Sequence, residues 1–364
     1  MNEAQIIDLE LYDPALTGNP LNLELRLSVE RYSHHVIGGP AFCDAEAYGR
    51  EMDVAELVNK LRAPAIARSR KTQEPLWWGY LSGVELGAGV GVSLDNVANK
   101  IQVVYAYVPS GAASAGTKVS TTWAQNDDSV TAYGYIEHKE SLSEATAAQA
   151  EQLRDRLLAS MAKPQPTLSR SSGEAMTASL KLSGWWNTFD WRFLAEAGTD
   201  AVETTEQIRA AVLALAQYIT GVTIWNASGV TSSEYREGDA TLLEEVTDLL
   251  LSGTTNDRQL MATVDSSRWL HIREEPANTS ARHILRRNHS LHTSMGALVP
   301  PEDCTIGVWA DVDILPDSVN LSRLANISPV FIESAEYDAR SGQARYVPRG
   351  QPKPSDLARL ITGK

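Results

Sequence analysis

The sequence lacks the features of a disulfide-rich secreted protein and of a membrane protein. Among 364 residues only Cys43 and Cys304 are cysteines, so we expect no disulfide framework and a reducing compartment. No apolar run approaches the roughly 20 residues of a membrane-spanning helix, and no membrane partner is expected. The first residues, MNEAQIIDLELYDP, lack the basic and apolar regions of a signal peptide, so we expect no export.

Motifs of catalysis and metal binding are also scarce. The sequence contains no Gly-x-Ser-x-Gly elbow and no phosphate-binding Walker loop, and neither cysteine stands in a nucleophile signature. His289-x-x-His292 has the spacing of two zinc ligands, yet residues 276–301 hold no Cys, Asp or Glu to complete a site. We therefore expect no catalytic residue, no cofactor and no metal, and we do not expect an enzyme.

Positive charge is in short supply. Against 46 acidic residues stand 32 Lys and Arg, which gives a net charge of -14 at pH 7. Such a chain is a poor candidate for gripping a phosphate backbone, because that affinity comes mainly from Lys and Arg. An acidic surface instead suits nucleic acid that passes without adhering. No single carboxylate pair stands out for glycoside hydrolysis, and that alternative stays open.

Alternating apolar residues are abundant in the first 110 residues. Within 21–30, leucine or valine alternates with polar residues, which is the period of a half-buried strand. The same reasoning predicts two strands in 75–94 and a third at 101–107. A short helix is expected at 53–62, with Asp53 as its cap.

The middle of the chain changes character twice. A helix is expected at 143–161, and a linker rich in Pro and Ser follows it up to residue 175. From residue 176 strand-like alternation returns. A second helix, at 204–219, is expected to start from a capping box formed by Thr204 and Gln207.

The remaining elements are a helix, two hairpins and a strand in TIGVWADV, residues 305–312. The helix is predicted at 240–252, capped by Asp239 and ended by Gly253. The hairpins are predicted at 258–274 and at 331–350.

The most unusual segment is SLKLSGWWNTFDWRF, residues 179–193, which holds three of the nine tryptophans. Aromatics of this kind can stack on sugars or bases, but they can also fill a core or an interface. Phe189, Trp191 and Phe193 alternate with Asp190 and Arg192, which predicts a strand with one buried and one polar face. We therefore favour packing and interface over a binding platform.

This segment has a weak counterpart earlier in the chain. Residues 93–105 align with 181–193 at an offset of 88, so that Leu94 meets Leu182 and Asn99 meets Asn187. Both segments predict a strand, a tight break and a second strand with large inward side chains. The pattern is compatible with a duplicated β-module.

Two longer stretches carry a family resemblance. The run EPLWWGYLSGVEL, continued by VSLDNVANKIQVVYAYV, resembles the first domain of hub proteins from the tails of long-tailed bacteriophages and phage-like tail systems. The later order is similar as well: LSGWWNTFDWRF, the TTEQIRAAV helix, the block that ends in RWLHIREEP, and FIESAEYDARSG.

The resemblance implies a β-rich α+β fold with two similar tube-type β-barrel domains, a connecting helical segment and an inserted α+β block. The expected domains are 1–110 (first β-barrel), 111–175 (helical connector and linker), 176–200 with 300–350 (second β-barrel), 201–299 (inserted α+β domain) and 351–364 (C-terminal tail).

The resemblance also implies a mechanical function. It predicts a virion structural protein assembled in the host cytoplasm: a homotrimeric hub of the tail tip or baseplate, with the tail tube or distal tail protein above and a spike or tail fibre below. DNA or a tape-measure protein would pass through its channel. The expected interface residues are Trp77, Trp78, Trp185, Trp186 and Trp191.

Two alternatives belong to other classes of protein. A distal tail protein that binds carbohydrate would expose several tryptophans around a groove. A tail-associated peptidoglycan hydrolase would need a cleft with two suitably spaced carboxylates or a zinc site.

Overall fold

A computed structural model describes most of the chain. The described residues are 6–107, 116–168, 176–194, 201–225, 227–233, 240–256, 258–274, 283–285, 290–293, 296–304, 318–320 and 330–348. Asp239, His289, the predicted strand at 305–312, part of the predicted linker (169–175) and the tail (351–364) lie outside them.

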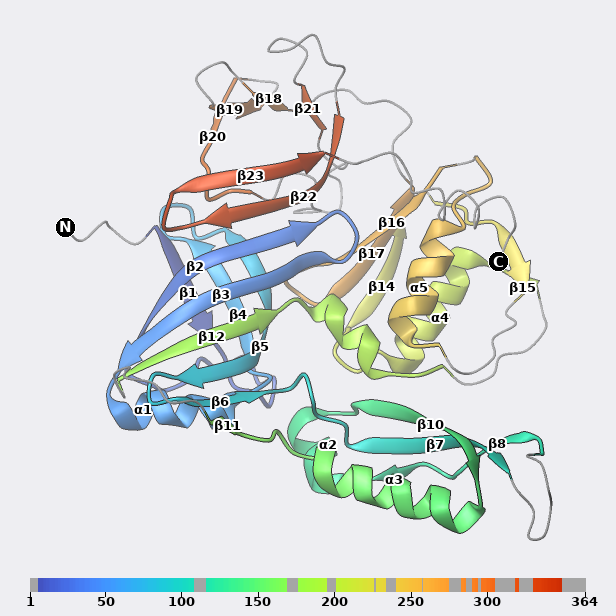
Figure 1. Ribbon diagram of the computed structural model, residues 1–364. Helices are drawn as coiled ribbons and strands as arrows, with labels where there is room; N and C mark the ends of the chain where they lie inside the picture. The colour runs from blue at the N-terminus through green and yellow to red at the C-terminus, as the bar shows by residue number, and fades with distance from the viewer. Residues whose placement is uncertain are drawn as a thin grey trace.

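A large, mostly antiparallel sheet forms the body of the molecule (Figure 1). Its central strands run in the order β1-β4-β5-β12-β3-β2-β22, so strands from both ends of the chain meet in it. These strands are β1 (Ile7–Leu11), β2 (Leu25–His35), β3 (Gly39–Gly49), β4 (Pro64–Ser69), β5 (Pro75–Leu86), β12 (Thr177–Ser183) and β22 (Val330–Asp338).

The sheet curls until β1 comes back into contact with β2, which gives it the shape of a half-barrel. Alternating side chains along each strand point to opposite faces of the curled sheet, and one of these faces is buried. In β4 every second residue is buried, and in β12 the buried residues are Ala178, Leu180 and Leu182. At one end, α1 (Glu51–Glu56) and a 3-10 turn, η1 (Leu57–Lys60), follow β3.

Shorter strands extend the sheet at its margins. The strand β6 (Val90–Ser93) pairs with β5 and with β11 (Thr167–Leu168), and β23 (Gln343–Pro348) pairs with β22. Beyond β22 lie β21 (Ser318–Asn320), β18 (His283–Leu285), β19 (Leu291–Thr293) and β20 (Leu298–Val299).

A module of residues 100–161 stands apart from this body, below it in Figure 1. Its strands β7 (Lys100–Tyr107) and β10 (Glu137–Ala145) are parallel, and β8 (Lys118–Ser120) and β9 (Ala124–Gln125) pair with β7. The helix α3 (Ala147–Met161) packs on β7, and α2 (Asp127–Tyr133) precedes β10. Val103, Tyr105, Ala145 and Ala150 form a small core of the module's own.

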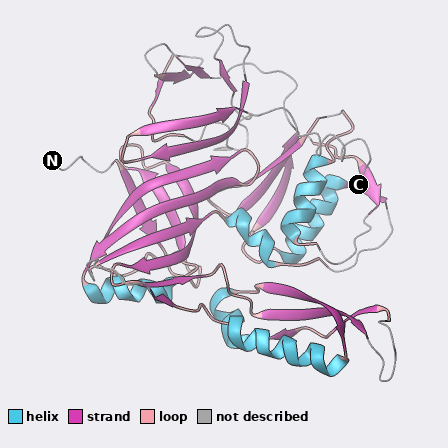
Figure 2. Cartoon of the chain, in the orientation of Figure 1, coloured by secondary structure: helices cyan, strands magenta, loops and turns pink. Residues whose placement is uncertain are grey.

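The third block lies beside the half-barrel and combines two helices with a small sheet (Figure 2). Its strands run in the order β14-β17-β16, and α4 and α5 contact each other and cover one side. The bounds are α4 (Thr204–Leu215), β14 (Gly221–Trp225), α5 (Leu242–Leu251), β16 (Leu260–Val264) and β17 (Trp269–Glu274), with a two-stranded ribbon of β13 (Ala201–Glu203) and β15 (Thr231–Ser233). This block shares one continuous hydrophobic core with the half-barrel.

The fold class is β-rich α+β, as predicted, and several elements fall where the sequence placed them. The strand β7 and the hairpin of β16 and β17 match their predicted ranges closely. The hairpin of β22 and β23 is also confirmed.

The strand predicted across 185–193 is wrong. Residues Trp185–Trp191 form a 3-10 helix, η2. In a 3-10 helix side chains three apart lie on one side. Trp186 and Phe189 accordingly stack with ring centroids 4.8 Å apart, and Thr188 Oγ1 donates to the Trp185 carbonyl at 2.7 Å. The sequence therefore contained aromatic residues three apart, as in a 3-10 helix, as well as the aromatic residues two apart from which the strand was predicted.

Because η2 is helical, the counterpart segments 93–105 and 181–193 do not share a local structure. Lys100–Tyr107 is a strand, whereas the residues aligned with its first half lie in η2. The predicted domain boundaries stay a prediction. The structure adds that β12 lies between β5 and β3, and that β7 pairs with β10 beyond residue 110.

Helix ends differ from the expected ones in detail. Glu203 precedes α4 without a side-chain cap, and Gln207 Nε2 donates to the Val202 carbonyl, so the predicted capping box is absent there. Capping boxes lie instead at Thr146 and Gln149 of α3 and at Thr241 and Glu244 of α5, so Thr241 and not the predicted Asp239 caps α5.

Two further helix starts were misplaced. The helix α1 begins at Glu51, before the predicted cap Asp53. The helix α3 begins at Ala147 rather than at 143, because residues up to Ala145 belong to β10.

Candidate functional site

The five predicted interface tryptophans lie inside the molecule or at its inner junctions. Trp77, Trp78, Trp185 and Trp186 are at most 8% exposed, and Trp191 is half-buried. Within the single chain, the structure therefore shows that these tryptophans pack against other parts of the same molecule. Contact with a second chain stays a prediction, and four of these side chains present almost no surface to a partner.

Trp185 and Trp191 belong to a ring of four aromatic side chains. Their partners are Tyr80 from β5 and Tyr218, which follows α4. Neighbouring centroids in the ring lie 5.2 to 5.8 Å apart, within the range of favourable aromatic pairs. The ring joins half-barrel, η2 and α+β block in one packed unit.

Two other tryptophans join the half-barrel to its neighbours, Trp78 to the α+β block and Trp186 to η2. Trp78 Nε1 donates to the Val264 carbonyl at 2.8 Å. Trp186 lies against Gly38, where an added Cβ would approach the indole ring to 2.8 Å. At the start of η2, Gly184 approaches Pro40 so closely that a Cβ would lie 1.7 Å from the Pro40 carbonyl oxygen. The strands of the half-barrel, the 3-10 helix η2 and the α+β block thus meet at the segment 179–193.

The same segment also contacts the module, through charged groups. The carboxylate of Glu137, whose side chain is 3% exposed, lies 2.8 Å from Lys100 Nζ and 3.3 Å from Arg192 Nε. Its second oxygen accepts a hydrogen bond from the Phe193 backbone N–H at 2.8 Å. Sequence reasoning missed Glu137 and Arg192, because no local pattern links residues 55 positions apart.

Aromatic rings surround these cations. Lys100 Nζ lies 5.0 Å from the Trp123 centroid and 5.3 Å from that of Tyr135, and the Arg192 guanidinium lies 5.0 Å from Tyr135. Lys139 Nζ lies 5.0 Å from the centroid of Phe193. Such cation–π contacts stabilise the charges that Glu137 alone would not balance.

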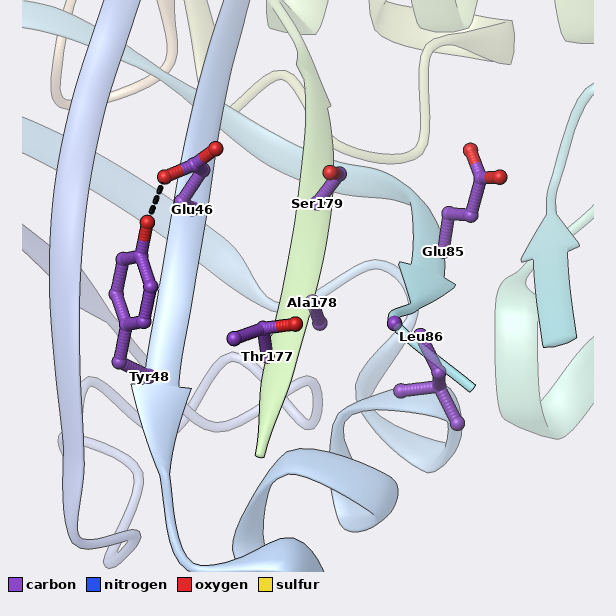
Figure 3. A pocket seen from close by; sticks show the side chains of 8 residues that line it. Glu46, Tyr48, Glu85, Leu86, Thr177, Ala178 and Ser179 are labelled. Carbon is purple, nitrogen blue, oxygen red and sulfur yellow. Dashed lines mark hydrogen bonds between the residues drawn. The ribbon is translucent and has the colours of Figure 1, made fainter. Parts of the chain in front are cut away.

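An open hollow of about 250 Å³ lies on the outer face of the half-barrel, across β3, β12 and β5 (Figure 3). Tyr48 donates a hydrogen bond to Glu46 there, and this bond raises the pKa of Tyr48 to about 12. Ser179 lies on the middle strand, β12, and Glu85 lines the side opposite Glu46. Two carboxylates, Glu46 and Glu85, and the hydroxyl groups of Tyr48, Thr177 and Ser179 line the hollow.

The histidines give no metal centre in the part of the chain that the structure describes, where no cluster of three or more His, Cys, Asp or Glu has suitable geometry. His34 and His35 point to opposite faces of β2, as adjacent strand residues must: His34 is fully buried and His35 is exposed. His292 hydrogen-bonds within its own turn, to Ser290 and to the Gly296 carbonyl. Within the described ranges, no helix is long and apolar enough to cross a membrane.

No protein-family model and no curated protein matches this chain. Among solved structures, one similar chain is the E. coli c3393 protein, described as a component of the type VI secretion system with structural similarity to the T4 bacteriophage tail proteins gp27 and gp5. The two chains are 8% identical, and the match covers 94% of this chain and 77% of the other at a TM-score of 0.42. A superposition of this quality establishes no shared function.

Proposed function

We propose that this chain is a structural protein of a phage tail or a phage-like tail system. It acts as the trimeric hub of the tail tip or baseplate, joins the sixfold tail tube to a threefold spike or fibre, and lines the central channel. It is located in the virion and performs no catalysis.

One observation carries this proposal: a curled sheet is built from both ends of the chain, and a connector module and an α+β block are inserted between its strands. The family resemblance likewise implies β-strands interrupted by a helical connector and an α+β block, although here the strands expected in two barrels lie in one sheet. The net charge of -14 adds support, because an acidic protein suits DNA that passes without adhering.

Burial of the tryptophans argues against the carbohydrate-binding alternative. A sugar platform needs exposed rings, and among the described tryptophans Trp269 alone is more than a third exposed, at 42%. The segment that most resembled a platform, η2, buries Trp185, Trp186 and Phe189.

The oligomeric state tests the proposal. Light scattering of the purified protein should give a trimer of 39.7 kDa subunits, or a ring when the tail tube protein is added. Electron microscopy of such rings should show threefold symmetry. A stable monomer that binds glycans, or a preparation that lyses cell walls, would refute the hub function.

A further inference from the structure

The module of residues 100–161 has its own core and meets the body mainly through polar groups. Val103 and Tyr105 are buried within the module, away from the main core. Within the module, Ile136 is buried in the main core and Tyr133 packs against that core. Two covalent connections, residues 94–99 and 162–168, hold the module to the half-barrel.

A single short segment, residues 133–139, supplies most of the contacts with the body. Tyr135 exchanges two hydrogen bonds with Gln217: its backbone N–H donates to Oε1 at 2.9 Å, and its carbonyl accepts from Nε2 at 3.0 Å. Tyr218 Oη donates to the Tyr133 carbonyl at 2.6 Å.

Gly134 allows the segment 133–139 to lie close against Gln217 and Tyr218 of the body. Its φ is +76°, which disfavours any side chain, and a Cβ there would lie 2.2 Å from Tyr218 Oη and 2.5 Å from Gln217 Nε2. The contact is therefore built for this geometry and leaves no room for a side chain.

Glu137 makes a second set of contacts between the segment 133–139 and the body. It joins Lys100 of its own module to Arg192 and the Phe193 N–H of the body. Arg192 is itself fixed to the body, since its Nη1 donates to the Leu215 carbonyl at 3.2 Å.

We infer that residues 133–139 form a releasable latch, closed by Glu137, which holds the module of residues 100–161 against the body and lets it move as a unit when the latch opens. Opening the latch exchanges these hydrogen bonds and ion pairs for contacts with water, and it withdraws a single buried side chain of the segment, Ile136, from the main core. The separate core of the module keeps it folded in the open state. This inference concerns the single chain and does not rest on the proposed function.

Hydrogen exchange of the full-length chain with Glu137→Gln tests the latch. The neutral side chain loses the attraction to Lys100 and Arg192, so the amides of Tyr135 and Phe193 should exchange about tenfold faster. Amides of the module core, such as Val103, and of the half-barrel, such as Leu180, should keep their rates. Glu140→Gln is the matched control, because this carboxylate lies on the same strand, its side chain is 42% exposed, and it lies 3.3 Å from His138 Nε2.

Unchanged exchange at Tyr135 and Phe193 in Glu137→Gln would overturn the inference. Equal acceleration at Val103 would also overturn it, since the module would then unfold rather than move. A double variant gives an independent check: adding Arg192→Gln to Glu137→Gln should accelerate exchange little beyond the single change, because both changes open the same latch. Fully additive acceleration would mean that the two groups act separately.

Discussion

At the scale of single residues, burial decides what each polar group can do. His34 lies in the core between Tyr32 and Trp78, with ring centroids 5.8 and 5.7 Å away. Its Nε2 donates to the Leu76 carbonyl at 2.6 Å, and its Nδ1 is buried without a hydrogen-bond partner. Protonation would place a charge and an unsatisfied donor in the core, and burial accordingly lowers the pKa of His34 to about 4.

This burial predicts a loss of stability in mild acid. The unfolded chain binds a proton at His34 near pH 6.5, whereas the folded chain does so only near pH 4. The titration of His34 therefore costs the folded state nothing above about pH 6.5. As the pH drops towards 4, the free energy of unfolding falls, by roughly 2 kcal/mol between pH 7 and pH 5. Urea denaturation at the two pH values measures it.

The His34→Gln variant is the control for this prediction. Glutamine keeps a donor for the Leu76 carbonyl but does not titrate, so the variant should lose less stability than the parent over the same pH interval. Equal losses in both proteins would show that other groups cause the acid sensitivity.

At the scale of elements, capping and periodicity explain where helices begin. The capping box of α5 has Glu244 N–H donating to Thr241 Oγ1 at 3.2 Å, while Thr241 N–H donates to Glu244 Oε2 at 2.8 Å. This start fixes Leu242, Val246 and Leu250 in the main core. A cap one or two residues away would rotate these side chains out of it.

Thr241→Ala should therefore destabilise the protein by about 1 kcal/mol, because it removes the hydroxyl that satisfies the Glu244 N–H. Chemical denaturation of the purified variant measures the change. Thr241→Ser keeps the hydroxyl and should retain most of the stability; if the Ala and Ser variants were equally stable, the cap would contribute nothing.

At the scale of the whole molecule, both ends of the chain complete one sheet. The strand β22 pairs with residues 31–35 of β2, and Tyr337 lies 5.6 Å from Tyr32, centroid to centroid. Tyr32 and Ala335 are at most 1% exposed. The C-terminal hairpin thus covers apolar side chains and an open strand edge of the N-terminal half.

Deletion of residues 330–364 should consequently expose this edge, lower the melting temperature and promote aggregation. Thermal melting and light scattering measure both effects. Deletion of residues 349–364 alone is the matched control and should preserve the melting temperature, because it keeps every described strand. If the protein that lacks residues 330–364 melted at the same temperature as the full-length protein, β22 would be dispensable for stability.

The sequence by itself determined β7 and the hairpins of β16 with β17 and of β22 with β23, because alternation and turns are local signals. The alternation of β12 and the turn between β16 and β17 were visible in neighbouring residues. The tertiary structure alone decided that β12 lies between β5 and β3, that Trp185–Trp191 forms a 3-10 helix, and that Glu137 meets Arg192. Those outcomes depend on partners far apart in the chain, and a sequence pattern shows only which face of a segment will be buried. Which other segment buries it follows from the packing of the whole chain.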